Sequence, residues 1–457
     1  MAAEAIELAE LSAAPTRPSP ASSIKSSSAF DEEGANAVSA LPPVDGGKDA
    51  WLFLAAGTLC EALAWGAPFS AGVLHQYWLA TLFPEGTAGR DLITLAVTLQ
   101  TGLCYFACAF FGPLMRAYPQ YRVPFQVIGI AGTVFGIMGP AFATEPWHVL
   151  VTFGLIYPLS GLYYLPSVTL LFEWFQARRG IASGIMFAGT GIGGVVFPFT
   201  VSALLNRFGY KAALISISIG MGILGVATLP FLRPRLPVPK NSVEMAAARK
   251  VDTAFLKRST FYAFSGATLL VSFGNFIPSV WIPTYVTDLG MSEYDGTILL
   301  AVMNAASIPG LLILGHLSDI WPIRAVMTLS CSGSALACIF LWGFGKSIGM
   351  LSAFAVVFGL LGLSFSGIWA KLISTIAQDD PTLPTLIYSV FAVARGIGNI
   401  TSGPVANALL TSNLFAGGKG AYGVPNYGAL LLYSGLTMVA GSVAGVLFKT
   451  PRPQRLD

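Results

Sequence analysis

Twelve apolar stretches, each of the ~20 residues that a helix needs to cross a bilayer, recur along this sequence of 457 residues. Backbone polar groups in hydrocarbon must be hydrogen-bonded within their own segment, so the stretches are predicted to be transmembrane helices rather than strands. They run from Trp51 to Leu74, Leu92 to Met115, Val123 to Ala143, Trp147 to Phe172, Gly180 to Leu205, Ala212 to Leu232, Phe261 to Val286, Thr297 to Leu317, Ala325 to Phe344, Ile348 to Ala370, Thr385 to Leu410 and Tyr427 to Phe448.

The composition indicates an all-α integral membrane protein. Hydrophobic residues make up 54% of the chain and charged residues 10%, against roughly 25% charged residues in soluble domains, and the mean hydropathy is +0.69. The lipid bilayer is therefore an expected partner, and nucleic acid is not. The five cysteines all lie within the apolar stretches, so no disulfide framework, metal site or cofactor is expected.

Polar segments divide the chain into five predicted parts. A disordered cytoplasmic tail at 1–50 precedes a six-helix bundle at 51–232, a cytoplasmic linker at 233–259, a second six-helix bundle at 260–448 and a cytoplasmic tail at 449–457. The distribution of Lys and Arg sets the orientation of such a protein. If the N-terminus lies inside, the outer segments hold only Arg90, Arg207, Lys211, Lys346 and Lys419. A multi-pass protein with both termini in the cytoplasm, most simply in the plasma membrane, is expected.

Short motifs recur in the two halves at nearly constant spacing, which indicates an internal duplication. Gly112-Pro-Leu114 ends the second stretch as Gly315-His-Leu317 ends the eighth, and Gly191-Ile-Gly193 in the fifth corresponds to Gly396-Ile-Gly398 in the eleventh. With six plus six helices and Gly315-x-Leu317-Ser318-Asp319-x-x-x-x-Arg324 after the eighth stretch, the chain resembles the major facilitator superfamily. The resemblance implies a cytoplasmic gating motif formed by Gly315, Asp319 and Arg324, in which the acid pairs with a basic residue or caps a helix start.

A narrower resemblance, from about Asp45 onward, is to the monocarboxylate porters and particularly their fungal branch. Asp45-Gly46-Gly47 leads to Trp51, and Trp174-Phe175-Gln-Ala-Arg178-Arg179-Gly-Ile-Ala182-Ser-Gly184-Ile-Met-Phe-Ala188-Gly189 opens the fifth stretch. The resemblance implies that Arg178 and Arg179 anchor the cytoplasmic interface. The small residues from Ala182 to Gly194 are expected to allow tight helix contact.

The charges that members of this family use for proton-coupled carboxylate movement have no counterparts here. The position of the first-helix lysine is Phe69, and the Asp/Arg pair of the eighth helix falls at Asn304 and Ile308. The chain is expected to be a secondary active transporter of a small organic solute, monocarboxylate-porter-like and proton-coupled. The alternative, which the missing charges favour, is an efflux transporter of a larger fungal secondary metabolite.

Two ionisable residues fall near the centre of a predicted span, where a charge is costly and usually lines a cavity or an ion path. Glu61 lies midway along the first span and Arg395 midway along the eleventh. Glu61 is the candidate carrier of the coupling proton. Arg395 is the candidate partner of an anionic solute or of Glu61, and a permanent structural ion pair between the two remains the other interpretation.

Aromatic and amide side chains are the further candidates for solute binding. In the superfamily the first, fourth, seventh and tenth helices line the central cavity, and amphipathic rings there suit a planar or partly apolar solute. Packing or lipid contact explains any single ring equally well. The candidates are Trp65, Tyr163, Tyr164, Asn275, Trp281, Asn304 and Trp369.

Two other classes of function, an enzyme and a membrane sensor, fit the sequence less well than transport. An enzyme needs clustered catalytic groups, yet the three histidines lie at span ends or in an outer loop, and no paired carboxylates occur at membrane depth. No catalytic residue is therefore assigned. A non-transporting membrane sensor on the same fold would usually carry a long ordered cytoplasmic extension, which this sequence does not predict.

Overall fold

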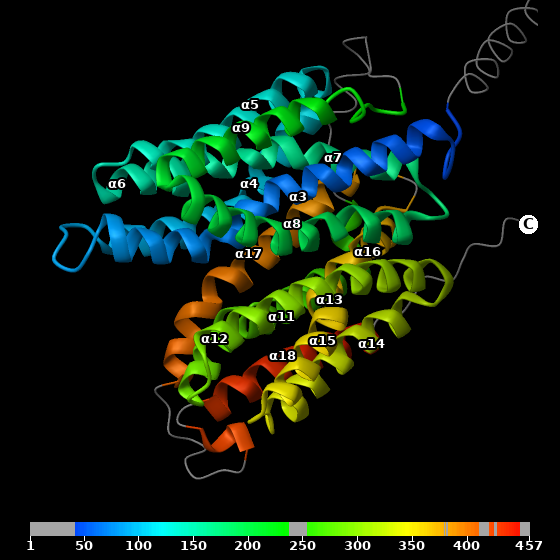
Figure 1. The fold of residues 1–457 in the computed structure, drawn as a ribbon. Coiled ribbons are helices and arrows are strands. Elements are labelled where there is room, and N and C mark those ends of the chain that lie inside the picture. Colours follow the sequence, from blue (N-terminus) through cyan, green and yellow to red (C-terminus); the bar gives the residue numbers. More distant parts are fainter. Residues whose placement is uncertain are drawn as a thin grey trace, which may run out of the picture. The chain divides into compact units, whose positions relative to one another are not determined.

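The computed structural model describes residues 42–236, 254–378, 380, 383–410, 420–424 and 427–447. Within these residues the regular structure is helical, and Figure 1 shows the order of the helices. Twelve of the described helical segments are long and apolar enough to cross a membrane, which confirms the predicted number.

The spans are built from the following elements. They are α3 (Lys48–Tyr77) with η1 (Trp78–Leu82); α4 (Asp91–Ala117); η2 (Pro119–Tyr121), α5 (Arg122–Met138) and η3 (Gly139–Phe142); α6 (Pro146–Val149), η4 (Leu150–Ile156), η5 (Tyr157–Ser160) and α7 (Gly161–Trp174); α8 (Arg179–Phe208); α9 (Tyr210–Thr228); α11 (Ser259–Asn275) and α12 (Ile277–Asp288), preceded by η6 (Ala254–Lys257); α13 (Glu293–Ile320); α14 (Ile323–Leu336) and η7 (Ala337–Trp342); α15 (Ile348–Leu361), η8 (Leu363–Ile368) and α16 (Trp369–Ala377); α17 (Leu383–Leu410); and α18 (Tyr427–Leu447), preceded by η9 (Gly420–Gly423).

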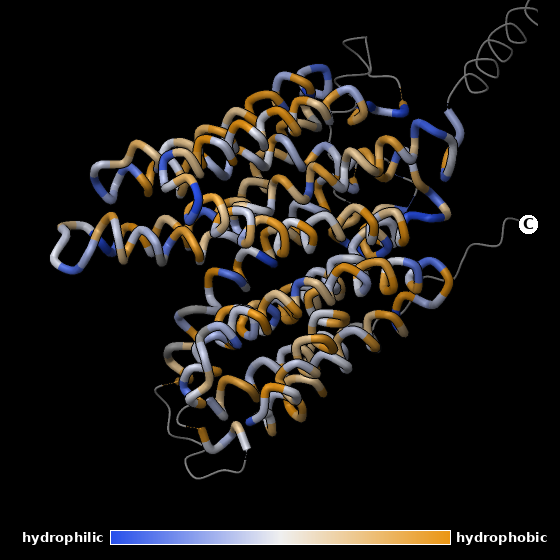
Figure 2. The backbone as a smooth tube through the Cα atoms, viewed as in Figure 1, coloured by the Kyte–Doolittle hydropathy of each residue, from blue (hydrophilic) through white to orange (hydrophobic). Residues whose placement is uncertain are grey.

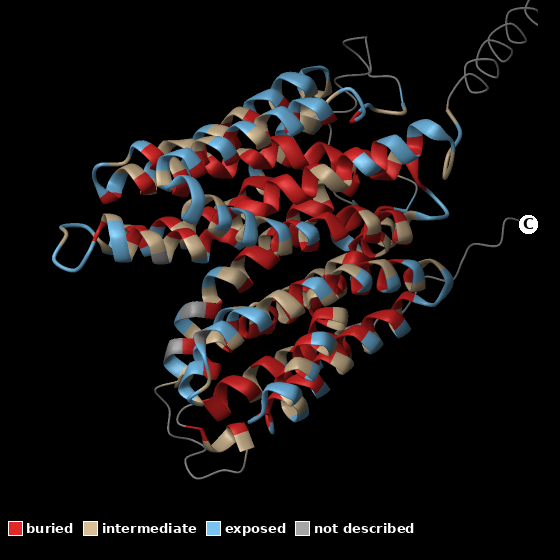
Figure 3. Ribbon diagram, viewed as in Figure 1, coloured by how far each residue is buried: buried red, intermediate tan, exposed pale blue. Residues whose placement is uncertain are grey.

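Hydrophobic side chains cover the outside of the helices as well as their contacts. Phe110, Phe135 and Ile223 are each more than half exposed although they lie within spans. Figure 2 shows hydrophobic residues along the helix bodies and hydrophilic ones concentrated at the connections, while Figure 3 shows the buried residues gathered where helices face one another. Exposed apolar residues on this scale fit a surface that contacts lipid, because soluble proteins rarely expose them in long runs.

The helices pack as two bundles with equivalent internal and mutual contacts. Within the first half α3 packs against α8, and within the second half α11 packs against the corresponding helix α17. Between the halves α8 packs along α13, and α4 packs along α17. The hydroxyl of Ser389 on α17 donates to the backbone oxygen of Cys108 on α4 at 2.7 Å. Two pairs of long helices therefore connect the bundles.

Glycines set the close approach of α8 to α13. A Cβ atom at Gly180 would lie 2.2 Å from the oxygen of Gly315, and one at Gly184 would lie 2.3 Å from the oxygen of Leu311. Real Cβ atoms do not come so close, so a larger residue would push the two helices apart. The tight contact predicted for the small residues of the fifth span is thus present, and it joins the two bundles.

Two spans of the second bundle are interrupted near their middle. The seventh breaks at Phe276, between α11 and α12, and the tenth breaks at Gly362, between α15 and η8. Asn275, the last residue of α11, donates its side-chain N–H to the oxygen of Gly362 at 2.6 Å. Broken helices leave backbone groups that need other partners, and here one amide joins both breaks.

The segments that flank the bundles are described only in part. Residues 1–41, 237–253 and 448–457, which hold most of the predicted tails and linker, lie outside the described residues. The first helix begins at Lys48, earlier than the predicted Trp51, after Gly47 with a φ of 86°, a conformation that glycine adopts without strain. At the start of the linker, the carboxylate of Glu173 accepts the backbone N–H groups of Arg235 and Leu236.

Candidate functional site

A cavity of about 110 Å³ lies between the two bundles. α3, α4 and α8 line it from the first half, and the broken seventh and tenth spans, α13 and α17 line it from the second. Its lining residues are Glu61, Trp65, Phe69, Tyr105, Phe187, Thr190, Gly191, Phe276, Ser279, Asn304, Ser307, Leu311, Leu363, Ser366, Trp369, Tyr388 and Arg395. Both ionisable residues that the sequence predicts at membrane depth therefore face one space.

Glu61 is fully buried on α3 and lines the cavity. Trp65 and Thr190 are polar neighbours of its carboxyl group, but neither carboxyl oxygen has a partner in hydrogen-bond geometry among the described residues. A direct hydrogen-bonded pair with Arg395 is therefore not formed. An isolated carboxylate away from water is unfavourable, so this group needs a proton, a solute or water for a partner.

Arg395 on α17 is held by neutral groups. Its Nε donates to the hydroxyl of Tyr105 on α4 at 3.3 Å, and its Nη2 donates to Oδ1 of Asn275 at 3.4 Å. Its guanidinium carbon lies 4.9 Å from the ring centroid of Phe276 and 5.9 Å from that of Trp369. Nη1 is buried and has no hydrogen-bond partner among the residues that the structure describes. Aromatic faces attract the cation, but they do not accept the N–H hydrogen atoms of Nη1.

The structure brings some of the other predicted binding residues to the cavity and places others elsewhere. Trp65, Asn304 and Trp369 line it, and Asn275 lies behind Arg395. Tyr163 and Tyr164 on α7 are instead buried inside the first bundle, where their hydroxyls bond to Thr228 and Cys108. Trp281 on α12 is likewise absent from the cavity lining. Aromatic content alone does not tell which face of a helix turns inward.

Several lining residues are absent from the sequence-based prediction. Tyr105 is the main one, because its ring lies 4.6 Å from that of Trp65 and its hydroxyl reaches Arg395. Thr190, Ser279, Ser307 and Ser366 add small polar groups. Small hydroxyl residues are common in membrane helices, so no sequence signal separates these from the rest. For Tyr105 the sequence does offer a signal: it is a polar aromatic residue in the second span, which the internal duplication pairs with the eighth.

Two of the three positions at which the monocarboxylate porters carry charges, Phe69 and Asn304, line the cavity. Ile308 faces Gly191 at the α8–α13 contact, where a Cβ atom on that glycine would lie 2.8 Å from Ile308 Cγ1. Ile308 is half-buried there, and Gly191 itself lines the cavity.

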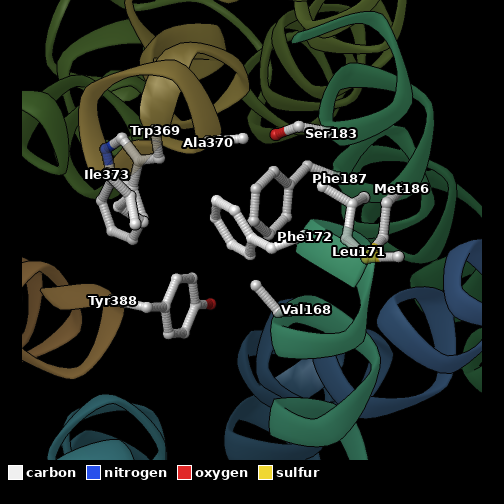
Figure 4. Close-up of a pocket in the computed structure, with 10 residues that line it drawn as sticks. All are labelled: Val168, Leu171, Phe172, Ser183, Met186, Phe187, Trp369, Ala370, Ile373 and Tyr388. Carbon is white, nitrogen blue, oxygen red and sulfur yellow. The ribbon is translucent and has the colours of Figure 1, made fainter. Parts of the chain in front are cut away.

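An apolar plug separates the cavity from the end of the bundles where α8 begins and α13 ends, which we term the Asp319 end. Phe187, Trp369 and Tyr388 line both the cavity and a second space of about 10 Å³. Figure 4 shows Phe172 and Phe187 between Trp369 of α16 and Met186 of α8. A cavity needs ~10–15 Å³ to hold one water molecule, so this second space has room for about one water molecule and none for an organic solute.

At the Asp319 end, the carboxylate of Asp319 caps α8 from the opposite bundle. Its Oδ1 accepts the N–H of Gly180 and its Oδ2 accepts that of Ile181, both at 2.8 Å. A carboxylate at a helix N-terminus satisfies free N–H groups and complements the helix dipole. Of the two roles expected for this acid, the structure shows the helix cap.

Asp45 holds the preceding loop from within the first half. Its two carboxylate oxygens accept the backbone N–H groups of Gln176, Ala177 and Arg178 at 2.8 to 2.9 Å. Burial alone would raise the pKa of Asp45, but these three hydrogen bonds and the charge of Arg178 outweigh it and hold that pKa below its ordinary 3.8. The two segments that carry the monocarboxylate-porter resemblance thus bind each other.

Arg179 of the predicted gating motif contacts its own bundle. It donates from Nε to the oxygen of Phe175 at 2.8 Å and from Nη2 to that of Phe172 at 3.3 Å, so it caps the end of α7. The side chain of Arg178 is exposed, and Arg324 lies near the start of α14. The backbone amides of Gly180 and Ile181, with Asp319 as their acceptor, join α8 to α13. Among the described residues no group of three His, Cys, Asp or Glu side chains could hold a metal ion.

Comparison with known proteins gives one family and a set of relatives. The family model described as Major Facilitator Superfamily matches residues 54–403. The MFS-type transporter hasB of Aspergillus fumigatus is 24% identical over 88% of this chain and 89% of its own length. The MFS transporter asaE of Aspergillus flavus is 25% identical over 88% and 86%, and the fujikurins efflux protein of Gibberella fujikuroi is 26% identical over 84% and 81%.

Proposed function

The chain belongs to the Major Facilitator Superfamily, and from this membership we propose that it is a secondary active exporter of an organic secondary metabolite. It is a multi-pass membrane transporter of this superfamily type. The proposal concerns which solute it moves, in which direction, and which ion drives the movement. The proposal rests on the cavity between the bundles, in which Glu61 and Arg395 are both buried without a full set of partners.

Export of a larger metabolite is favoured over monocarboxylate uptake for two reasons. One relative of similar length is named for the efflux of fujikurins. The cavity also presents Phe69 and Asn304 where the monocarboxylate porters carry charges. Drug-sized ligands occupy pockets of ~300–1,000 Å³, so the bundles would have to separate further to admit such a solute to the present 110 Å³.

Protons are the proposed driving ion, and Glu61 is their proposed carrier. A protonated carboxyl is neutral and can remain buried without a partner, whereas the carboxylate calls for water or a cation. Alternating exposure of the cavity to the two sides of the membrane would let this group load and release a proton. Lys and Arg placement supports cytoplasmic termini, with the Asp319 end facing inward. The plasma membrane is the proposed location.

A deletion strain provides the test. The gene is deleted in the organism that carries it, and metabolites in cells and medium are compared with those of the parent. We expect one organic compound to accumulate in the cells and to fall in the medium, and the wild-type gene or the control variant Arg207→Gln to restore its release. Arg207 is an exposed arginine near the end of α8, away from the cavity.

The same experiment separates the other functions. Unchanged export combined with lost growth on a short monocarboxylate would instead indicate the monocarboxylate porter. If no solute changes in cells, medium or growth tests, the chain does not act as a transporter in that organism, and the sensor interpretation takes precedence.

A further inference from the structure

The permanent charge in the cavity belongs to Arg395, whose contacts within the described part of the chain include no acidic group. A guanidinium group stays protonated in proteins, whereas a carboxyl group can become neutral by taking up a proton. The groups that contact Arg395 are the hydroxyl of Tyr105, the amide oxygen of Asn275 and two aromatic rings. None of these contacts supplies a negative charge, although the side chain is only 8% exposed.

The unsatisfied part of this side chain faces the solute space. Nη1 is buried, lacks a hydrogen-bond partner within the described part of the chain, and belongs to a residue that lines the cavity. A buried donor that is left unpaired is unfavourable, and more so when it is charged. An acidic group of a solute would satisfy both the charge and the donor.

We infer that the solute binds as an organic anion, with its acidic group on Nη1 of Arg395 and an unsaturated, planar body against the aromatic walls of the cavity. This inference rests on the proposed function, because it takes the cavity to be the solute site. Four rings line the cavity: Trp65 and Tyr105 have ring centroids 4.6 Å apart, and Phe276 and Trp369 lie beside Arg395. Planar rings or conjugated systems stack on such surfaces.

A cationic solute fits the same cavity less well. The rings of Phe276 and Trp369 already interact with the guanidinium group of Arg395. A cationic solute would have to compete with Arg395 for these ring faces. A second positive charge beside Arg395 would be repelled. Glu61, on the opposite bundle, remains available to bond a hydroxyl or carbonyl group of the anion when it carries its proton.

Matched probes test the chemical class without knowledge of the natural solute. The purified full-length chain in lipid nanodiscs is titrated with 2-naphthoate, its neutral methyl ester and 2-naphthylmethylammonium, and with the biphenyl analogues of all three. We expect an acid to bind about tenfold tighter than its ester and its amine, as a charge-assisted hydrogen bond allows. Arg395→Gln should remove the preference, and Arg207→Gln should keep it.

Binding of the acid, ester and amine to the wild-type chain tests the anion preference even if Arg395→Gln does not fold. Equal binding of acid and ester, tighter binding of the amine, or no binding of either acid at millimolar concentration would overturn the inference. Such a result would leave export in the deletion experiment standing. A deletion strain without any changed metabolite would sink the proposed function whatever these probes do.

Discussion

At membrane depth an ionisable side chain is expensive, and this makes Glu61 and Arg395 the residues on which the account depends. The sequence predicts both residues as functional, because charged residues are rare within transmembrane helices. Their relation could not be read from sequence. The structure places them on opposite bundles, facing one cavity, without a direct bond between them.

Replacement of Glu61 tests proton coupling. We expect Glu61→Gln to abolish solute accumulation driven by a pH gradient, because the amide cannot exchange the proton, while solute-for-solute exchange continues. Both are measured in vesicles that contain the purified chain. Glu145→Gln, an exposed residue between the third and fourth spans, serves as the control and should accumulate solute as the wild type does. Accumulation by Glu61→Gln that still follows the pH gradient would refute the proton role.

Asn275 is predicted to position Arg395 rather than to touch the solute. Its Oδ1 accepts from Arg395 and its Nδ2 donates to Gly362, so Asn275→Leu should weaken binding of the acid probe about tenfold, the value of one lost bond to a charged group. Binding of the neutral ester should change little. Asn206→Leu is the control, because Asn206 is exposed on α8 and does not line the cavity, and it should leave the binding of both probes unchanged. Equal losses for acid and ester would mean a general structural defect.

At the scale of the helices, hydropathy predicted the spans well and their ends less well. The first helix continues to Leu82 and the tenth span to Ala377, because a helix does not stop where the hydrocarbon does. The small residues from Ala182 to Gly194 predicted that α8 makes a close helix contact, but not that the contacting helix is α13. Asp319 caps a helix that begins 140 residues earlier in the chain, and Tyr105 bonds to Arg395 from the other bundle. Both contacts depend on the tertiary structure and could not be predicted from the sequence.

The contact of α8 with α13 gives a prediction for glycine. Gly184→Ala should destabilise the packed state by about 1–3 kcal/mol, as overpacking does, because the new methyl group meets the oxygen of Leu311 at 2.3 Å. Gly220→Ala on α9 adds the same methyl group where nothing lies within 4 Å. Thermal unfolding of the two purified variants should differ, with Gly184→Ala the less stable. Equal melting temperatures would contradict the close approach.

Across the two bundles, the apolar plug and the cap of Asp319 suit a state in which the cavity is shut off from the Asp319 end. In Figure 1 the ribbons of the two bundles approach each other where α8 begins and diverge toward α12. Because the side chains in Figure 4 fill most of the space toward the Asp319 end, the cavity is predicted to open on the opposite side.

Thiol labelling tests this asymmetry. Ser279 lines the cavity and Ser183 lines the plug, while the five native cysteines are buried. A membrane-impermeant thiol reagent should modify Ser279→Cys from the side opposite the Asp319 end and leave Ser183→Cys unmodified. Adding Asp319→Asn, which removes one acceptor from the cap of α8, should increase labelling of Ser183→Cys. Labelling of Ser183→Cys before that change would show that the plug is open.

Whether the chain exports an organic anion that binds Arg395 is tested by transport of the compound that the deletion strain retains, measured in inside-out vesicles with an imposed proton gradient. Wild-type and Arg207→Gln vesicles should accumulate this compound. Arg395→Gln vesicles should stay at the level of vesicles without the protein. Accumulation by Arg395→Gln equal to that of the wild type would refute binding at Arg395, and no accumulation by the wild type would refute export.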